Sequence, residues 1–179
     1  AACIFCPREQ FSPSIRISDE VFQTVIDRFV EANVQAVKLV GFGEPTLHTQ
    51  VIPYMEMLSK RGFEVLLNTN GSRLHWLGVD NVLTHADEVI FSLHSLDPDE
   101  HRAIFRFDFA QTAYANLDAL LKANRRFNRL ITIYVVATAL NSGIDDIVSR
   151  YSDQAKIRVS GCSNRALGTF NDDIKATDI

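Results

Sequence analysis

The chain has 179 residues, of which 46% are hydrophobic and 22% are charged, and its formal net charge is −4. This composition is typical of one folded domain and excludes collagen, an intrinsically disordered chain and a low-complexity linker. No apolar run approaches the roughly 18 residues of a membrane-spanning helix, so we expect no membrane partner. The three cysteines are an odd number without a signal-peptide pattern, which favours the reducing cytoplasm over a disulfide framework.

One dense group of basic residues, Lys122, Arg125, Arg126 and Arg129, lies at helical spacing near a predicted helix end. Such a group is typical of a solvated helix terminus, where cations compensate the helix dipole. Because the other basic residues are scattered and the net charge is negative, we expect no nucleic-acid partner.

Helical and extended periodicities alternate along the chain. Ser18 is a candidate N-cap, Gly62 a candidate left-handed C-cap, and Asp97 marks a further helix start. In chain order, the patterns predict a helix over 21–30, a strand over 36–40, a helix over 51–61, strands over 63–67 and 88–93, helical packing from Asp97 to Leu121, a strand over 130–137, a helix over 144–151 and a strand over 157–159.

The predicted strands are nearly continuous apolar runs, which favours a parallel sheet covered by helices. An open doubly wound sheet and a whole or partial barrel both fit this pattern. In either fold the loops after the strands face one crevice, where ligands bind. The polar and glycine residues expected at that crevice are Gly41, Gly43, Glu44, Asn68, Asn70, Gly71, Ser92, His94, Ser95, Asn141, Asn164 and Arg165.

Cys3 and Cys6 form a Cys-x-x-Cys pair before the first predicted helix, so we expect them at the same crevice. Such a pair fits half of a zinc site, a thioredoxin-like redox pair or two packing cysteines. The zinc interpretation is weakened because Cys162 is solitary and no histidine shows ligand-like spacing with it. The redox interpretation is weakened by Pro7 and the polar segment that follows, since no helix opens there.

Several other polar residues have a simpler structural interpretation. Asn70 before Gly71 is typical of a turn, and Asp97 is better explained as an N-cap than as an acid or base. His48 and His94 are expected to be structural or solvent-facing, and Cys162 to be a packing thiol.

Four segments in this order, CIFCPRE, GFGEPTLH, LNTNG and FSLHSLD, resemble the radical S-adenosylmethionine (radical SAM) enzyme superfamily over nearly the whole chain. Cys3 and Cys6 match the second and third cysteines of that family's Cys-x3-Cys-x2-Cys loop, which holds a 4Fe-4S cluster. The first cysteine of the motif would lie before Ala1. Phe42 stands where the family's Gly-Gly-Glu-Pro motif has its first glycine.

The resemblance implies a set of contacts to S-adenosylmethionine (SAM). Gly43, Glu44 and Pro45 match the motif that receives the methionine amino group, with Glu44 as the charged acceptor. Asn68, Ser92 and Asn141 would orient the ribose and carboxylate. The segments VVATALN and SGCSNRALG look like later strand ends, and the second is similar to a pattern of the auxiliary-cluster (SPASM-type) branch.

The fold implied by the resemblance is a partial parallel (β/α)6 barrel of TIM-barrel type, truncated at the first strand. Residues 1–179 would form a single core domain, with the first strand and a C-terminal extension missing. Such a fragment is expected to be inactive alone, because the first cluster cysteine is absent from it.

The implied activity is reductive cleavage of SAM to a 5′-deoxyadenosyl radical, which abstracts hydrogen from a small-molecule or peptide substrate. The catalytic groups would be the cluster and the cofactor, supplied with electrons by a donor such as flavodoxin or ferredoxin. Two alternatives stay open: a non-catalytic metal- or nucleotide-binding barrel, and a phosphate-binding barrel enzyme in which GFGEP and NTNG are anion loops.

Overall fold

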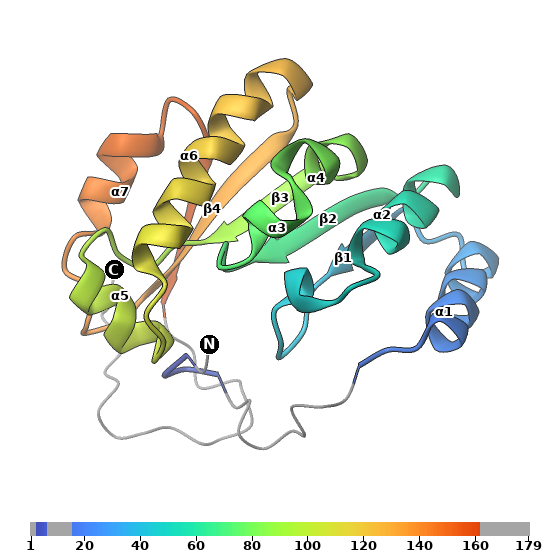
Figure 1. The fold of residues 1–179 in the computed structure, drawn as a ribbon, viewed down its shortest axis with the longest axis horizontal. Helices are drawn as coiled ribbons and strands as arrows, with labels where there is room; N and C mark the ends of the chain where they lie inside the picture. The colour runs from blue at the N-terminus through green and yellow to red at the C-terminus, as the bar shows by residue number, and fades with distance from the viewer. Residues whose placement is uncertain (1–2, 7–15, 162–179) are drawn as a thin grey trace.

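The computed structural model describes residues 3–6 and 16–161 of the chain. Five strands form one sheet in sequential order, and each strand pairs parallel with the next (Figure 1). Because the strand order never reverses, the sheet has the topology of a barrel wall and not that of a doubly wound sheet. The strands are β1 (Ala36–Leu39), β2 (Glu64–Thr69), β3 (Glu88–Ser92), β4 (Leu130–Ala137) and β5 (Lys156–Gly161).

Helices connect successive strands, and α2, α3, α4 and α6 lie in front of the sheet in Figure 1. No helix among the described residues is long and apolar enough to cross a membrane. The helices are α1 (Asp19–Glu31), the 3-10 helix η2 (Pro45–Leu47), α2 (Val51–Lys60), α3 (Leu74–Leu77), α4 (Val79–His85), α5 (Pro98–Phe105), α6 (Ala110–Phe127) and α7 (Ile144–Tyr151).

The two faces of the sheet differ in character. Along β2, Val65 and Leu67 are fully buried in the core beneath the helices, whereas the alternate residues Leu66 and Asn68 are only half-buried. In a parallel sheet, paired residues share a face, so the register carries this alternation across all strands. Within the described part of the chain, helices therefore cover one face, and the opposite face carries polar side chains.

The predicted helix boundaries are confirmed where a local cap sets them. The Ser18 hydroxyl accepts from the Val21 amide, and the Asp97 carboxylate accepts from the amides of Asp99 and Glu100. Gly62 has a φ of +82°, the left-handed conformation expected after α2.

Two features of the elements differ from the prediction. Strand β2 continues through Thr69, where a turn over 68–71 was predicted. Helices α3 and α4 were not predicted, because four and seven residues are too few to show a helical periodicity.

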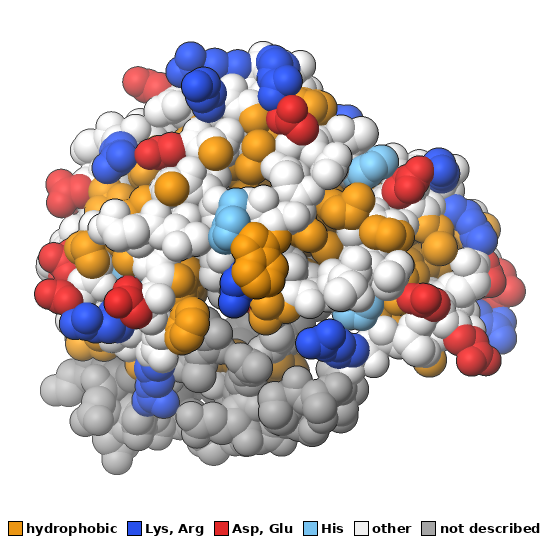
Figure 2. Space-filling view, in the orientation of Figure 1, with side chains coloured by type: hydrophobic (Ala, Val, Ile, Leu, Met, Phe, Trp, Pro, Cys, Tyr) orange, Lys and Arg blue, Asp and Glu red, His pale blue; other side chains and the backbone are white. Residues whose placement is uncertain are grey.

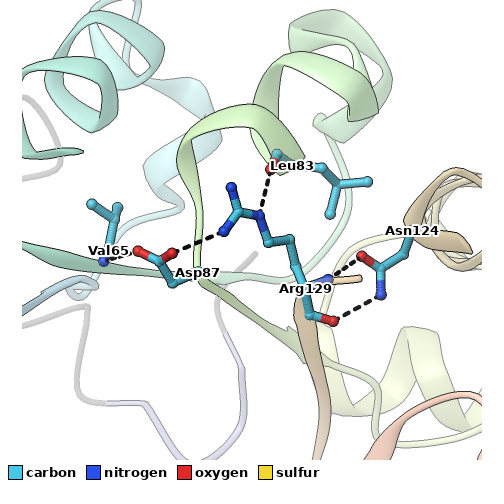
Figure 3. Close-up of polar contacts among 5 residues, drawn as sticks. All are labelled: Val65, Leu83, Asp87, Asn124 and Arg129. Atoms are coloured by element: carbon cyan, nitrogen blue, oxygen red, sulfur yellow. Dashed lines mark hydrogen bonds and ion pairs between the residues drawn. The ribbon is translucent and has the colours of Figure 1, made fainter. Parts of the chain in front are cut away.

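The amino ends of the strands are joined by a polar network (Figure 3). The Asp87 carboxylate accepts from the Val65 amide at 2.9 Å and pairs with Arg129 at 3.0 Å, and Arg129 also donates to the Leu83 carbonyl at 3.2 Å. Asn124 bonds the amide and carbonyl of Arg129. Figure 2 shows Lys and Arg side chains gathered over the end of α6, so this basic group lies away from the carboxyl ends of the strands.

Candidate functional site

The two cysteines lie in one turn, which is docked against α5 and the loop after β3. The Cys6 amide donates to the Cys3 carbonyl at 2.9 Å, and both thiols are free and half-buried. The Ile4 amide donates to the Ile104 carbonyl at 3.0 Å, near the end of α5. Figure 1 shows this N-terminal segment beside the lower end of α5.

His94 is the residue on which the cysteine turn rests. The rings of Phe5 and His94 meet in a T-shaped arrangement at a centroid distance of 5.3 Å, and the His94 ring also stacks on Phe105 at 4.9 Å. His94 is buried, and its Nδ1 accepts from the Val136 amide at 3.1 Å. The cysteine turn is therefore held against the carboxyl ends of β3 and β4, as expected.

The surroundings of Cys3 keep its thiol in the neutral form. Burial raises the pKa of Cys3 to about 11, with further contributions from Cys6 and from the negative charge of Glu44. The Cys3 thiol is consequently protonated at neutral pH, and a metal ion binding there would displace the proton. Cys3, Cys6, Glu44 and the His94 loop thus share one end of the sheet.

Glu44 is fixed by a network that the sequence analysis did not identify. It is the N-cap of η2, and its Oε1 accepts from the Thr46 amide at 3.2 Å and from the hydroxyls of Thr46 and Thr69, each at 2.7 Å. Its Oε2 accepts from the Asn70 amide at 2.8 Å. Because Oε2 carries one bond, it retains acceptor capacity for a ligand donor.

The remaining predicted cofactor residues differ in how far their polar groups are already hydrogen-bonded within the protein. Gly43 and Pro45 flank Glu44, and a Cβ at Gly43 would have no atom within 4 Å, so the backbone there is open to a ligand. The half-buried side chains of Asn68 and Ser92 make no hydrogen bond to any other described residue.

Asn141, by contrast, uses its whole amide inside the protein. Its Nδ2 donates to the carbonyls of His94 at 2.8 Å and Val136 at 2.9 Å, and its Oδ1 accepts from the amide and hydroxyl of Thr138. A cofactor contact at Asn141 would have to replace one of these bonds and would lose its free energy. The cofactor role of Asn141 stays a prediction.

The structural interpretations of other polar residues agree with the contacts. Asn70 Oδ1 accepts from the Ser72 amide at 2.9 Å, a local turn bond, and the His48 ring contacts the Ile17 carbonyl and the Gln50 amide. The predictions for Cys162, Asn164 and Arg165 fall outside the described residues.

The cysteine turn supplies part of the ligand set of an iron-sulfur cluster. Thiolates are the ligands that such clusters require, and two thiols in one turn fit two of its iron ligands. Within 3–6 and 16–161, no group of three or more His, Cys, Asp or Glu side chains is placed to hold a metal. The described thiols therefore fit part of a cluster site.

A family model described as the radical SAM superfamily matches residues 1–150. The chain belongs to the radical SAM superfamily. A GTP 3′,8-cyclase from Pseudomonas entomophila (strain L48) is 28% identical over 176 residues, covering 95% of this chain and 52% of that protein. A probable GTP 3′,8-cyclase from Thermococcus kodakarensis is 27% identical over 122 residues, covering 67% of this chain and 39% of the relative. The chain thus spans about half or less of these relatives.

Solved radical SAM structures share the fold. Streptococcus suis SuiB bound to S-adenosylmethionine has a TM-score of 0.73 at 17% identity, covering 99% of this chain and 40% of that one. SuiB bound to its precursor peptide SuiA also gives 0.73, at 18% identity, covering 98% and 39%. These neighbours are partial TIM barrels, so the predicted fold class is confirmed: this radical SAM chain is an α/β partial barrel whose helix-free face is the inner one.

Proposed function

We propose that this chain holds a 4Fe-4S cluster at Cys3 and Cys6, binds SAM beside it, and provides the core of a radical SAM enzyme. The observation that carries the proposal is the position of the cysteine turn and Glu44 at the carboxyl ends of neighbouring strands: Phe5 contacts His94 just after β3, and Glu44 accepts from Thr69 and the Asn70 amide at the end of β2. These groups are separated by about forty residues of sequence and meet only through the fold. When bound, the cluster and SAM supply reductive carbon–sulfur cleavage and hydrogen abstraction.

The protein residues have separate tasks in this proposal. Cys3 and Cys6 would ligate iron, and Glu44 Oε2 would accept from the amino group of SAM in a charge-assisted bond. Thr46, Thr69 and the Asn70 amide fix that carboxylate before SAM arrives. Such preorganisation lowers the ordering cost of binding. Asn68 and Ser92 would supply neutral hydrogen bonds, because their polar groups are unused by the described residues.

The direct test is anaerobic iron and sulfide reconstitution of the full-length protein. We expect Cys3→Ala and Cys6→Ala to abolish the visible iron-sulfur absorbance and the formation of 5′-deoxyadenosine. Cys162→Ala is the matched control and should retain both. Stoichiometric zinc without visible absorbance would instead support the non-catalytic metal-binding alternative.

A second test separates SAM binding from cluster binding. Glu44→Gln keeps the size of the side chain but loses the charge, so we expect SAM affinity to fall about tenfold or more while iron content stays unchanged. Equal SAM affinity in the variant and the wild type would remove Glu44 from the proposed site.

The curated relatives are GTP 3′,8-cyclases, and they match 67% and 95% of this chain at 27% and 28% identity. We therefore propose a nucleoside triphosphate as the substrate to test first. A peptide is the second candidate, because SuiB binds its precursor peptide SuiA. Addition of GTP to the reconstituted protein should accelerate SAM cleavage and consume GTP. If GTP does not change the rate of SAM cleavage and is not consumed, GTP is excluded as the substrate.

A further inference from the structure

The inner face of the sheet carries a row of side chains that the proposed cofactor contacts do not use. The register pairs Ser92 with Tyr134 and Tyr134 with Arg158, so the three side chains project from adjacent strands on the same face. Ser160 lies on this face two residues beyond Arg158 on β5. Strands are spaced by about 4.8 Å, which places the Arg158 backbone roughly 10 Å from Ser92.

Arg158 lies against the Tyr134 ring and has no counter-ion in the part of the chain that the structure describes. Its guanidinium lies over the Tyr134 ring, 5.9 Å from the centroid, and the Tyr134 hydroxyl lies 2.5 Å from the Ser160 hydroxyl. The Arg158 side chain is exposed, and no carboxylate among residues 3–6 and 16–161 pairs with it. A stacked guanidinium keeps its donors available for a planar or tetrahedral anion.

Three carboxylates of the sheet and of the segments after its strands accept hydrogen bonds from local donors. Glu44 accepts four hydrogen bonds, as described above. Glu100 accepts from the Ser95 hydroxyl at 2.6 Å and from Ser142, and Glu88 accepts from the Thr132 hydroxyl at 2.6 Å. These carboxylates have local donors, and within 3–6 and 16–161 none of them forms an ion pair with Arg158. The Arg158 guanidinium is therefore available to an anionic ligand.

We propose that Arg158, held by its stack on Tyr134, binds a phosphate group of the substrate on the inner face, beside the SAM contacts. The inference rests on the proposed function, because it places substrate and cofactor on one face. It adds the recognition element that a nucleoside triphosphate requires, since the arginine fork matches phosphate oxygens two at a time. A purely protective charge on an edge strand is the competing explanation, and it predicts no effect on ligands.

The test measures ligand affinities of the reconstituted full-length protein by anaerobic calorimetry. The ligands are inorganic triphosphate, GTP, guanosine and SAM. We expect Arg158→Gln to weaken triphosphate and GTP binding about tenfold or more, with guanosine and SAM affinities unchanged. Arg158→Lys should retain part of the affinity, because the charge remains but the fork is lost.

Lys156→Gln is the matched control. Lys156 is a cation on the same strand and face, two residues toward the amino end, and we expect it to leave all four affinities unchanged. Tyr134→Phe keeps the ring and loses the contact with Ser160, so it should weaken triphosphate binding less than Arg158→Gln does. It also serves if Arg158→Gln fails to fold.

Three results would overturn the inference: no binding of triphosphate or GTP by the wild type, an equal loss in Lys156→Gln, or a loss of SAM affinity in Arg158→Gln. The last result would assign Arg158 to the carboxylate of the cofactor. In all three cases, iron content and SAM cleavage would still report on Cys3 and Cys6, so the proposed function is judged separately.

Discussion

His101 is an imidazole buried among aromatic rings. It is 0% exposed, its ring contacts those of Phe105, Phe109 and Tyr114, and neither ring nitrogen has a hydrogen-bond partner among the described residues. Burial lowers the pKa of His101 to about 4, although Asp108 opposes the shift. Burial likewise lowers the pKa of His94 to about 3. Both rings are therefore neutral in the folded protein.

These histidines predict a pH dependence of stability. Above the unfolded pKa of about 6.5, both states carry neutral rings, and there is no effect. As the pH falls from about 6.5 toward 4, the unfolded chain binds protons that the folded chain cannot, so the free energy of unfolding falls by up to about 1.4 kcal/mol per pH unit for each ring. Urea unfolding at pH 7, 6 and 5 measures the slope.

His101→Phe should reduce that slope and raise stability at pH 7 by about 1 kcal/mol, because two unsatisfied nitrogens are removed from an aromatic cluster. An unchanged slope in His101→Phe would show that His101 ionises in the folded state.

Gly71 lies where a Cβ would clash with a buried side chain. Its φ is +75°, and a Cβ there would lie 2.1 Å from Cζ of Phe91. Gly62 has a similar φ of +82° but open space around it. We expect Gly62→Ala to cost about 1 kcal/mol from backbone strain alone, and Gly71→Ala to cost more than about 2 kcal/mol because the buried Phe91 ring must move. Chemical denaturation of both variants compares them, and equal losses would rule out the clash.

At the scale of the elements, the sequence predicts features set by neighbouring residues but not contacts between residues far apart in the chain. Ser18 and Asp97 bond amides two or three residues away, so the sequence identifies both helix starts. Arg129 and Asp87 are far apart in the sequence and meet only because β3 and β4 are neighbours. The spacing of the basic group predicts a helix end, but it does not indicate the polar network at the amino ends of the strands that Figure 3 shows.

This polar network should stabilise the fold without affecting the site. Arg129→Met removes the bond to the Leu83 carbonyl and leaves the half-buried Asp87 carboxylate with the Val65 amide but without its cation, so we expect a loss of about 1–2 kcal/mol. Arg126→Met breaks an exposed pair with Asp80 and should cost under about 1 kcal/mol. Denaturation ranks the two variants, and iron content should match the wild type in both. A larger loss in Arg126→Met than in Arg129→Met would contradict the stabilising role of the polar network.

At the scale of the whole molecule, the sequence predicts where the site lies, at the carboxyl ends of the strands, but not the hydrogen bonds within it. The rule that loops after parallel strands converge correctly brings the cysteine turn, Glu44 and Ser92 to one end. Thr69 was assigned to a turn, so its bond to Glu44 was missed. Tyr134 and Arg158 lie within strands read as apolar runs, and only the register shows that they share a face with Ser92.

His94 links the N-terminal turn to the sheet, because its ring contacts Phe5 and accepts from the Val136 amide. His94→Ala removes the ring that supports Phe5 and that stacks on Phe105, whereas His94→Phe keeps a ring and loses only the acceptor for the Val136 amide. We expect His94→Phe to lose about 1–3 kcal/mol of stability from the unpaired amide, yet to load iron like the wild type.

His94→Ala should load iron well below the wild-type level, because the cysteine turn loses its support. Exchange of the Ile4 amide, which bonds the Ile104 carbonyl, should then accelerate in hydrogen-exchange measurements on the metal-free protein. If His94 has only a structural role, both variants lose stability, and the two variants have the same Ile4 amide exchange rate and the same iron content. If His94→Ala loads iron fully, the turn is positioned by Ile4 and Ile104 alone, and the ring of His94 is only part of the core.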